Sequence, residues 1–218
     1  MKLAVIAAAA VLGAAIAGCA STTPMPGHTM PEAAAAAPSA PQLHAAMRGL
    51  WQGHIATTRD YALAVHAGNA GAAQKAEAAV VGNARQIAGA VSGFYGPAAG
   101  DGLFKLLAGH WGGVKALTNA AKAGDAAGGD QAMAALAANG TEIARFLAGA
   151  NPRNWTVDAL QGALLMHAGD HRQQIDAMMA NAPVAQQQQL WTDMQHHMGM
   201  IADVLSDGIA KQFPDKAN

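Results

Sequence analysis

The chain has 218 residues, a length that suits one domain of ordinary size. Its formal net charge is −1 and only 12% of its residues are charged, so it lacks the basic composition typical of a nucleic-acid-binding protein. Hydrophobic residues make up 52% of the chain but aromatic residues only 5%. Because alanine supplies much of the apolar content, we expect closely packed helices around a thin core.

Residues 1–18 are predicted to be a targeting segment. After a positively charged start, the apolar run Leu3–Ile16 is too short for a typical membrane span. It leads into Ile16-Ala17-Gly18-Cys19, and Cys19 is the only cysteine in the chain. This arrangement resembles a bacterial lipoprotein signal, which implies cleavage before Cys19 and lipidation of that residue. By the same resemblance, Ala20 after the cysteine implies an outer-membrane anchor facing the periplasm of the cell envelope.

Residues 19–42 are predicted to be a flexible tether, because five prolines stand among alanine, serine and threonine. Such a composition cannot bury a core and favours an extended chain. Within the tether, Met25-Pro26-Gly27-His28-Thr29-Met30 combines thioethers with an imidazole, ligands that suit copper(I). The simpler alternative is that this stretch is only a linker. The remaining residues, 43–218, form the predicted folded domain.

From residue 43 onward, apolar residues recur at helical spacing and no long stretch alternates with the period of a strand. Turn-forming Gly, Asn, Asp and Pro residues interrupt the pattern, and Thr156 is a plausible N-terminal cap. The sequence therefore predicts an all-α protein with six helices, approximately at residues 43–66, 72–91, 98–123, 130–147, 157–180 and 183–213.

A leucine-led apolar segment that ends in histidine occurs three times in the domain. Each of these histidines is followed 29 or 30 residues later by Asn or His, and the midpoint of each interval falls at a turn. The three pairs are His54 with Asn83, His110 with Asn139, and His167 with His197. A fixed period of this kind indicates a repeated supersecondary unit. We therefore predict three αα-hairpin repeats, each placing its two polar residues at the same height in the bundle.

Four histidines are the predicted metal ligands: His54, His110, His167 and His197. Imidazole is the commonest metal ligand in proteins, and four of them suit zinc, copper or nickel. Asn83 and Asn139 are expected to support and orient the ligands. The alternative is a metal-free layer of hydrogen-bonded His and Asn side chains. His196 precedes His197, and on a helix only one of the two can face the interior.

A second pattern lies in His167-Ala168-Gly169-Asp170-His171-Arg172-Gln173-Gln174, where two histidines four residues apart share one helix face. The string resembles the His-x-x-x-His-Arg-x-Gln stretch of the DinB-like four-helix metal-binding family. That resemblance implies that both histidines are ligands, with a third from an earlier helix, which His54 or His110 could supply. Apart from the resemblance, we expect His171 to support the ligands from beside the site or to lie at the surface.

Two further segments carry a longer resemblance, Leu43-His44-x-x-Met47-Arg48-x-Leu50-Trp51-x-x-His54-x-x-x-Thr58-Arg59 and Ile209-Ala210-Lys211-Gln212-Phe213-Pro214-Asp215-Lys216. They are similar to a family of small bacterial helical proteins, and the likeness spans most of residues 43–216. It implies a histidine on each odd-numbered helix and no particular activity.

The sequence favours a protein without enzymatic activity, because it contains no Glu-x-x-His pair, His-Glu-x-x-His motif, phosphate-binding loop or nucleophile elbow. We expect a lipid-anchored envelope protein whose histidine-lined interior binds a transition metal or a small polar ligand. A DinB-like metal-dependent enzyme is one alternative. A ligand-free structural or interaction module is the other.

Overall fold

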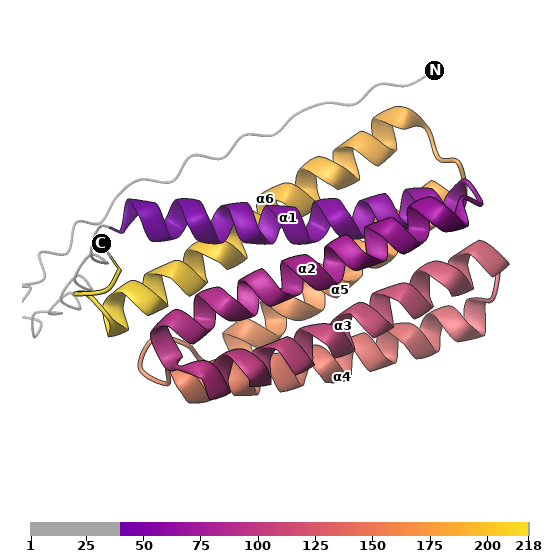
Figure 1. Ribbon diagram of the computed structural model, residues 1–218. Coiled ribbons are helices and arrows are strands. Elements are labelled where there is room, and N and C mark those ends of the chain that lie inside the picture. Colours follow the sequence, from indigo (N-terminus) through magenta and orange to yellow (C-terminus); the bar gives the residue numbers. More distant parts are fainter. Residues whose placement is uncertain (1–39, 218) are drawn as a thin grey trace, which may run out of the picture. The chain divides into compact units, whose positions relative to one another are not determined.

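The computed structural model describes residues 40–217. The predicted signal peptide, Cys19 and nearly all of the tether lie outside these residues. The described part contains six α-helices and no strand, which confirms the all-α six-helix bundle (Figure 1). The helices are α1 (Pro41–His66), α2 (Ala70–Tyr95), α3 (Pro97–Ala123), α4 (Ala126–Ala150), α5 (Val157–Met179) and α6 (Val184–Gln212).

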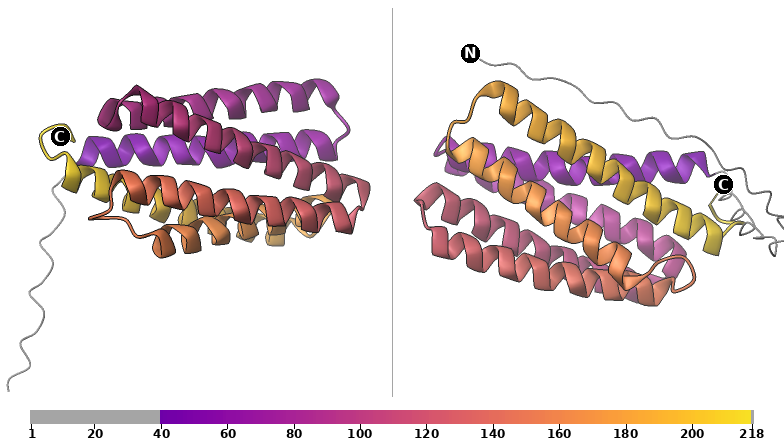
Figure 2. Two further views of the ribbon diagram at one scale, coloured as in Figure 1. Left: turned by 90° about the horizontal axis from the view of Figure 1, so that it is seen from below. Right: turned by 180° about the vertical axis from the view of Figure 1, so that it is seen from behind.

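Each helix packs against the next one in the chain, and α6 packs against both α5 and α1, so the six helices close a ring. The view from behind in Figure 2 shows α6 running back from the turn that follows α5 and crossing α1 obliquely. The odd-numbered helices α1, α3 and α5 also contact one another. Side chains on the inner faces of these three helices can therefore meet in the middle of the bundle.

Local sequence explains where the helices begin. The side chains of Asn69, Asp125 and Thr156 accept hydrogen bonds from backbone N–H groups in the first turns of α2, α4 and α5. These contacts satisfy donors that have no partner within the helix. The chain reverses direction at Gly96 and Gly124, whose φ angles of 89° and 68° favour glycine. The cap predicted at Thr156 is confirmed.

Three predicted boundaries differ from the structure by about one helical turn: the end of α2, and both the start and the end of α4, which continues to Ala150 beyond the predicted end at residue 147. Helix α2 continues to Tyr95 and ends only at Gly96, beyond the predicted end at residue 91. Helix α4 begins at Ala126, before the predicted start at residue 130. The Asp125 side chain accepts from Gly128 N at 2.9 Å, so the two glycines at 128 and 129 lie inside the helix and not in the turn.

A polar layer separates two apolar clusters inside the bundle. We define the first apolar cluster by residues that include Met47, Trp51, Leu103, Leu107, Leu160 and Ile201, and the second by residues that include Tyr61, Trp111, Val114, Leu136, Ile175 and Met178. Along α1, α3 and α5, the buried histidines lie between residues of the first and the second cluster.

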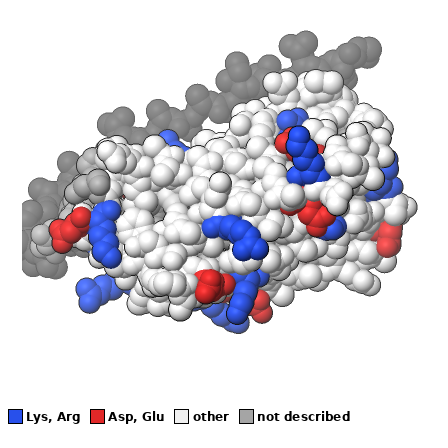
Figure 3. Space-filling view, viewed as in Figure 1, with Lys and Arg blue, Asp and Glu red and all other residues white. Residues whose placement is uncertain are grey.

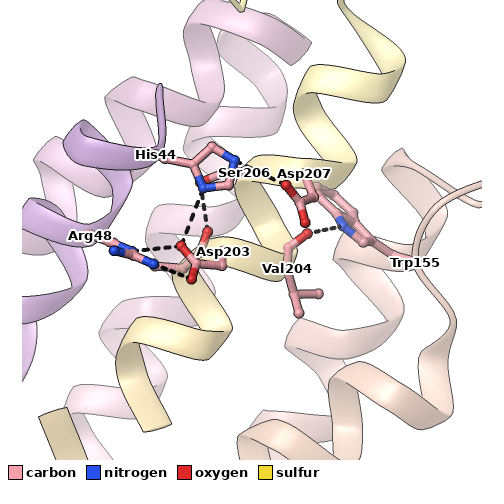
Figure 4. Close-up of polar contacts among 8 residues, drawn as sticks. His44, Arg48, Trp155, Asp203, Val204, Ser206 and Asp207 are labelled. Atoms are coloured by element: carbon pink, nitrogen blue, oxygen red, sulfur yellow. Dashed lines mark hydrogen bonds and ion pairs between the residues drawn. The ribbon is translucent and has the colours of Figure 1, made fainter. Parts of the chain in front are cut away.

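An ion-pair network joins the N-terminal part of α1 to the C-terminal part of α6 (Figure 4). His44 lies 3.3 Å from Asp203 and 3.0 Å from Asp207, and Arg48 Nη2 lies 2.6 Å from Asp203. The hydrogen bond from Arg48 is the main cause that lowers the pKa of Asp203 below its usual value. On the face seen in Figure 3, charged residues of both signs are scattered in small groups. Exposed ion pairs contribute little to stability, so the buried layers hold the bundle together.

Candidate metal centre

Four buried histidines meet at the centre of the bundle: His54 from α1, His110 from α3, and His167 and His171 from α5. Their side chains are between 1% and 5% exposed. One ring nitrogen from each lies within 4.8 Å of those of the others. This group could hold a metal ion.

The two histidines of α5 make the closest pair in the group. Their Nε2 atoms lie 3.1 Å apart and their ring centroids 4.4 Å apart. The other pairs of rings in the group have centroids 5.6 to 6.0 Å apart. In a tetrahedral site with metal–nitrogen bonds of about 2.0–2.1 Å, the nitrogens stand about 3.3 Å apart. The α5 pair is already near that spacing, while the nitrogens of the whole group lie within 4.8 Å of one another.

Several ring nitrogens in the group are buried without a hydrogen-bond partner. They are both nitrogens of His110, Nδ1 of His167 and Nδ1 of His171. Buried polar atoms in native proteins are nearly always paired, and an exception calls for an explanation such as an ion or an ordered water. Buried ring nitrogens without a close partner, in rings that meet at one place, are consistent with a metal site.

Burial keeps these imidazoles neutral. It lowers the pKa of His54 from 6.5 to about 3, with a further contribution from the charge of His110. It lowers the pKa of His110 to about 4, an effect that the amide of Asn139 partly opposes. Burial and the neighbouring imidazoles also lower the pKa of His167 and His171 well below 6.5. At neutral pH each ring therefore retains a lone pair for a metal.

Asn83 and Asn139 brace the two helices that carry His54 and His110. Asn83 Nδ2 donates to the carbonyl oxygen of Leu50 at 2.9 Å, and Asn139 Nδ2 donates to that of Leu106 at 3.1 Å. In an α-helix each of these carbonyls also accepts from the N–H four residues later, which here belongs to the histidine. Each asparagine thus fixes the helical turn from which a histidine projects.

A glycine makes room for each of these asparagines. A Cβ atom added to Gly53 would lie 3.0 Å from Asn83 Nδ2, and one added to Gly109 would lie 3.1 Å from Asn139 Nδ2. Because each glycine directly precedes its histidine, Gly-His on one helix and Asn on the next form matching contacts in the first two hairpins. The third hairpin contains no such asparagine, so threefold repetition stays a prediction.

The group of four differs from the predicted ligand set in one residue. It contains His171, which was expected to support the ligands, and does not contain His197, which was predicted to be a ligand. His171 shares the inner face of α5 with His167, four residues away. His197 lies beside Asp170, with its Nδ1 atom 2.7 Å from the carboxylate. Three helices rather than four therefore supply the close histidines.

His197 is buried and His196 is exposed, which answers which of the two faces inward. The charge of His197 contributes to the lowered pKa of His167, so His197 lies near the group. Sequence reasoning did not single out Asp170, although it stands inside the string that resembles the DinB-like family. A carboxylate that holds one nitrogen of a histidine is a common arrangement around metal sites.

Comparisons with protein families, curated proteins and solved structures returned no match. Among residues 40–217, none of the helices combines the length and hydropathy needed to cross a bilayer. Any assignment of function therefore depends on the chemistry of the histidine group.

Proposed function

We propose that this protein binds one transition-metal ion in the interior of its helical bundle. The ligands in this proposal are His54, His110, His167 and His171. The supporting observation is that four buried, neutral imidazoles converge within 4.8 Å, with neither ring nitrogen of His110 making a hydrogen bond of standard geometry. A small polar ligand that donates hydrogen bonds would meet the same nitrogens, and is the other ligand class for this interior.

Because all four proposed ligand atoms are nitrogens, the candidate metals are those that prefer nitrogen ligands. The group contains neither thiolate nor carboxylate, so Mg²⁺ and Ca²⁺, which prefer oxygen, are poor candidates. Zn²⁺, Cu²⁺ and Ni²⁺ all bind imidazole, and copper binds most tightly in the usual order of affinities. With four protein ligands the site would be closed, as in structural zinc sites, whereas a catalytic site keeps a position open. This favours stable binding of the ion over turnover.

The test is metal stoichiometry in purified protein covering the described domain. After chelation and reloading with Zn²⁺ or Cu²⁺, one ion per chain is expected in the wild type. His110→Ala and His171→Ala should each lower the affinity at least tenfold, while exposed His196→Ala should leave it unchanged. If the wild type binds no metal, the histidines form the metal-free polar layer, for which the 3.1 Å contact between His167 and His171 is the favouring observation.

His197→Ala distinguishes the two ligand sets. A loss as large as that of His171→Ala would make His197 a ligand, as the sequence pattern predicted. A small loss would instead assign His197 and Asp170 a supporting role beside the site. Open coordination and turnover of a substrate would favour the DinB-like enzyme.

The envelope location is a separate proposal based on Ile16-Ala17-Gly18-Cys19, which lies outside the described residues. In a Gram-negative host, the full chain should fractionate with the outer membrane and incorporate labelled fatty acid. Cys19→Ala should abolish both properties. Labelling that persists in the variant would contradict the proposal.

A further inference from the structure

The bundle contains a second feature that the metal proposal does not use, a cavity of about 30 Å³ within the first apolar cluster. Apolar side chains from several helices line it, and no polar atom faces it. Its walls include Trp51, Val91, Leu103, Leu160 and Leu164. Native interiors contain only a few voids larger than a water molecule per domain, and this one lies close to the histidine group.

The cavity lies next to the histidine group. Trp51 lines the cavity and also meets His54 edge to face, with ring centroids 5.9 Å apart and an interplanar angle of 83°. Leu164 precedes His167 by less than one helical turn, about 4.5 Å along the helix axis. The cavity and the histidine group are therefore neighbours in the interior, and Trp51 contacts both.

Size and polarity define what the cavity can hold. A water molecule needs two to four polar partners, and this cavity offers none, so it favours an apolar occupant. A dry cavity of about 150 Å³ accommodates benzene or xenon. One of about 30 Å³ is too small for a ring and has room for a single large atom or a diatomic molecule.

We infer that this cavity binds a small apolar diatomic molecule of the dioxygen class. Binding in the cavity depends on the apolar walls alone and does not require the metal. Any effect of the bound molecule on the metal rests on the proposed function, because only an occupied histidine group would place an ion beside it.

Xenon is the probe, since it reports apolar cavities both by NMR and in pressurised crystals. The wild-type domain is expected to bind one xenon atom in contact with Leu103 and Leu160. Val91→Leu adds a methylene to the wall and should lower xenon affinity at least tenfold. The matched control is Val80→Leu on the same helix; Val80 is also buried but belongs to the second cluster, and this variant should bind xenon as the wild type does.

Leu160→Ala provides a test in the opposite direction, because it enlarges the cavity and should raise xenon occupancy. Dioxygen under pressure should broaden the methyl resonances of the same lining residues in the wild type more than those of the second cluster. The inference is overturned if xenon does not bind the wild type at this place. It is also overturned if Val91→Leu and Val80→Leu bind xenon equally.

The two proposals can fail separately. His110→Ala is expected to lose the metal and keep xenon, while Val91→Leu is expected to lose xenon and keep the metal. Xenon binding without any metal binding would refute the proposed function and leave the cavity assignment intact.

Discussion

Acid should destabilise the metal-free protein through its buried histidines. In the folded state, burial lowers the pKa of His54 to about 3 and that of His110 to about 4, against 6.5 as the ordinary value. The unfolded chain therefore binds more protons than the folded chain as the pH falls below 6.5. The contribution of these histidines to the free energy of unfolding is therefore fully present above pH 6.5, and it is lost as the pH falls toward the folded-state pKa values.

The magnitude follows from the separation between the pKa and the pH. At pH 5, a histidine in the unfolded chain is mostly protonated, while His54 and His110 in the folded chain are still neutral. Each of these two histidines therefore lowers the free energy of unfolding by about 2 kcal/mol between pH 8 and pH 5. Together they remove at most about 4 kcal/mol, because the charge of His110 contributes to the shift of His54. The lowered pKa values of His167 and His171 also make the protein less stable in acid. A loss of this size is a large part of the total stability of a typical domain, about 5–15 kcal/mol.

The assay is urea unfolding in the presence of a chelator, followed by circular dichroism from pH 8 to pH 5. His110→Gln should reduce the pH-dependent loss by about 2 kcal/mol, because it removes one buried titrating group. His196→Gln, which changes an exposed histidine, should leave the loss unchanged. Equal stability at pH 8 and pH 5 in the wild type would refute the reasoning, as would a His110→Gln variant with the wild-type dependence.

Three further predictions concern packing and metal. Gly53→Ala should give a free energy of unfolding about 1–2 kcal/mol below that of Gly49→Ala, since only the first substitution presses on Asn83; equal values in urea unfolding would contradict this contact. Gly208→Ala would force the indole of Trp155 from its place and should cost about 1–3 kcal/mol, with a change in tryptophan fluorescence; an unchanged spectrum and stability would argue against the packing. Metal at about a hundredfold excess over Kd should add about 2.7 kcal/mol to stability, reversibly with a chelator; an unchanged melting temperature would count against binding to the folded state.

Much of the fold could be predicted because local signals and long-range packing agree in this chain. Gly, Asn, Asp and Pro residues mark the turns, and helical periodicity is uninterrupted between them. The start of α4 was misplaced because Gly128 and Gly129 favour a turn by composition, whereas the cap at Asp125 allows the helix to begin earlier. A single side-chain hydrogen bond of this kind is difficult to rank from sequence alone.

The site was predicted in part for a similar reason. Regular spacing located His54, His110 and His167 on three helices that meet inside the bundle. The prediction for His197 assumed equal rises along two antiparallel helices, a rule that gives height but not the direction of a side chain. Its Nδ1 atom lies next to Asp170, and the spacing of four residues on α5 favours His171 instead.

X-ray absorption spectroscopy of the metal-loaded domain tests coordination by four histidines, because it reports the number and type of atoms bound to the ion. Four-histidine coordination predicts a first shell of about four nitrogen atoms at about 2.0–2.1 Å for zinc, with the outer-shell scattering of imidazole rings. In His171→Ala that imidazole count should fall, and in His196→Ala it should not. A first shell dominated by oxygen or sulfur, or a spectrum unchanged in His171→Ala, would rule out coordination by these four histidines.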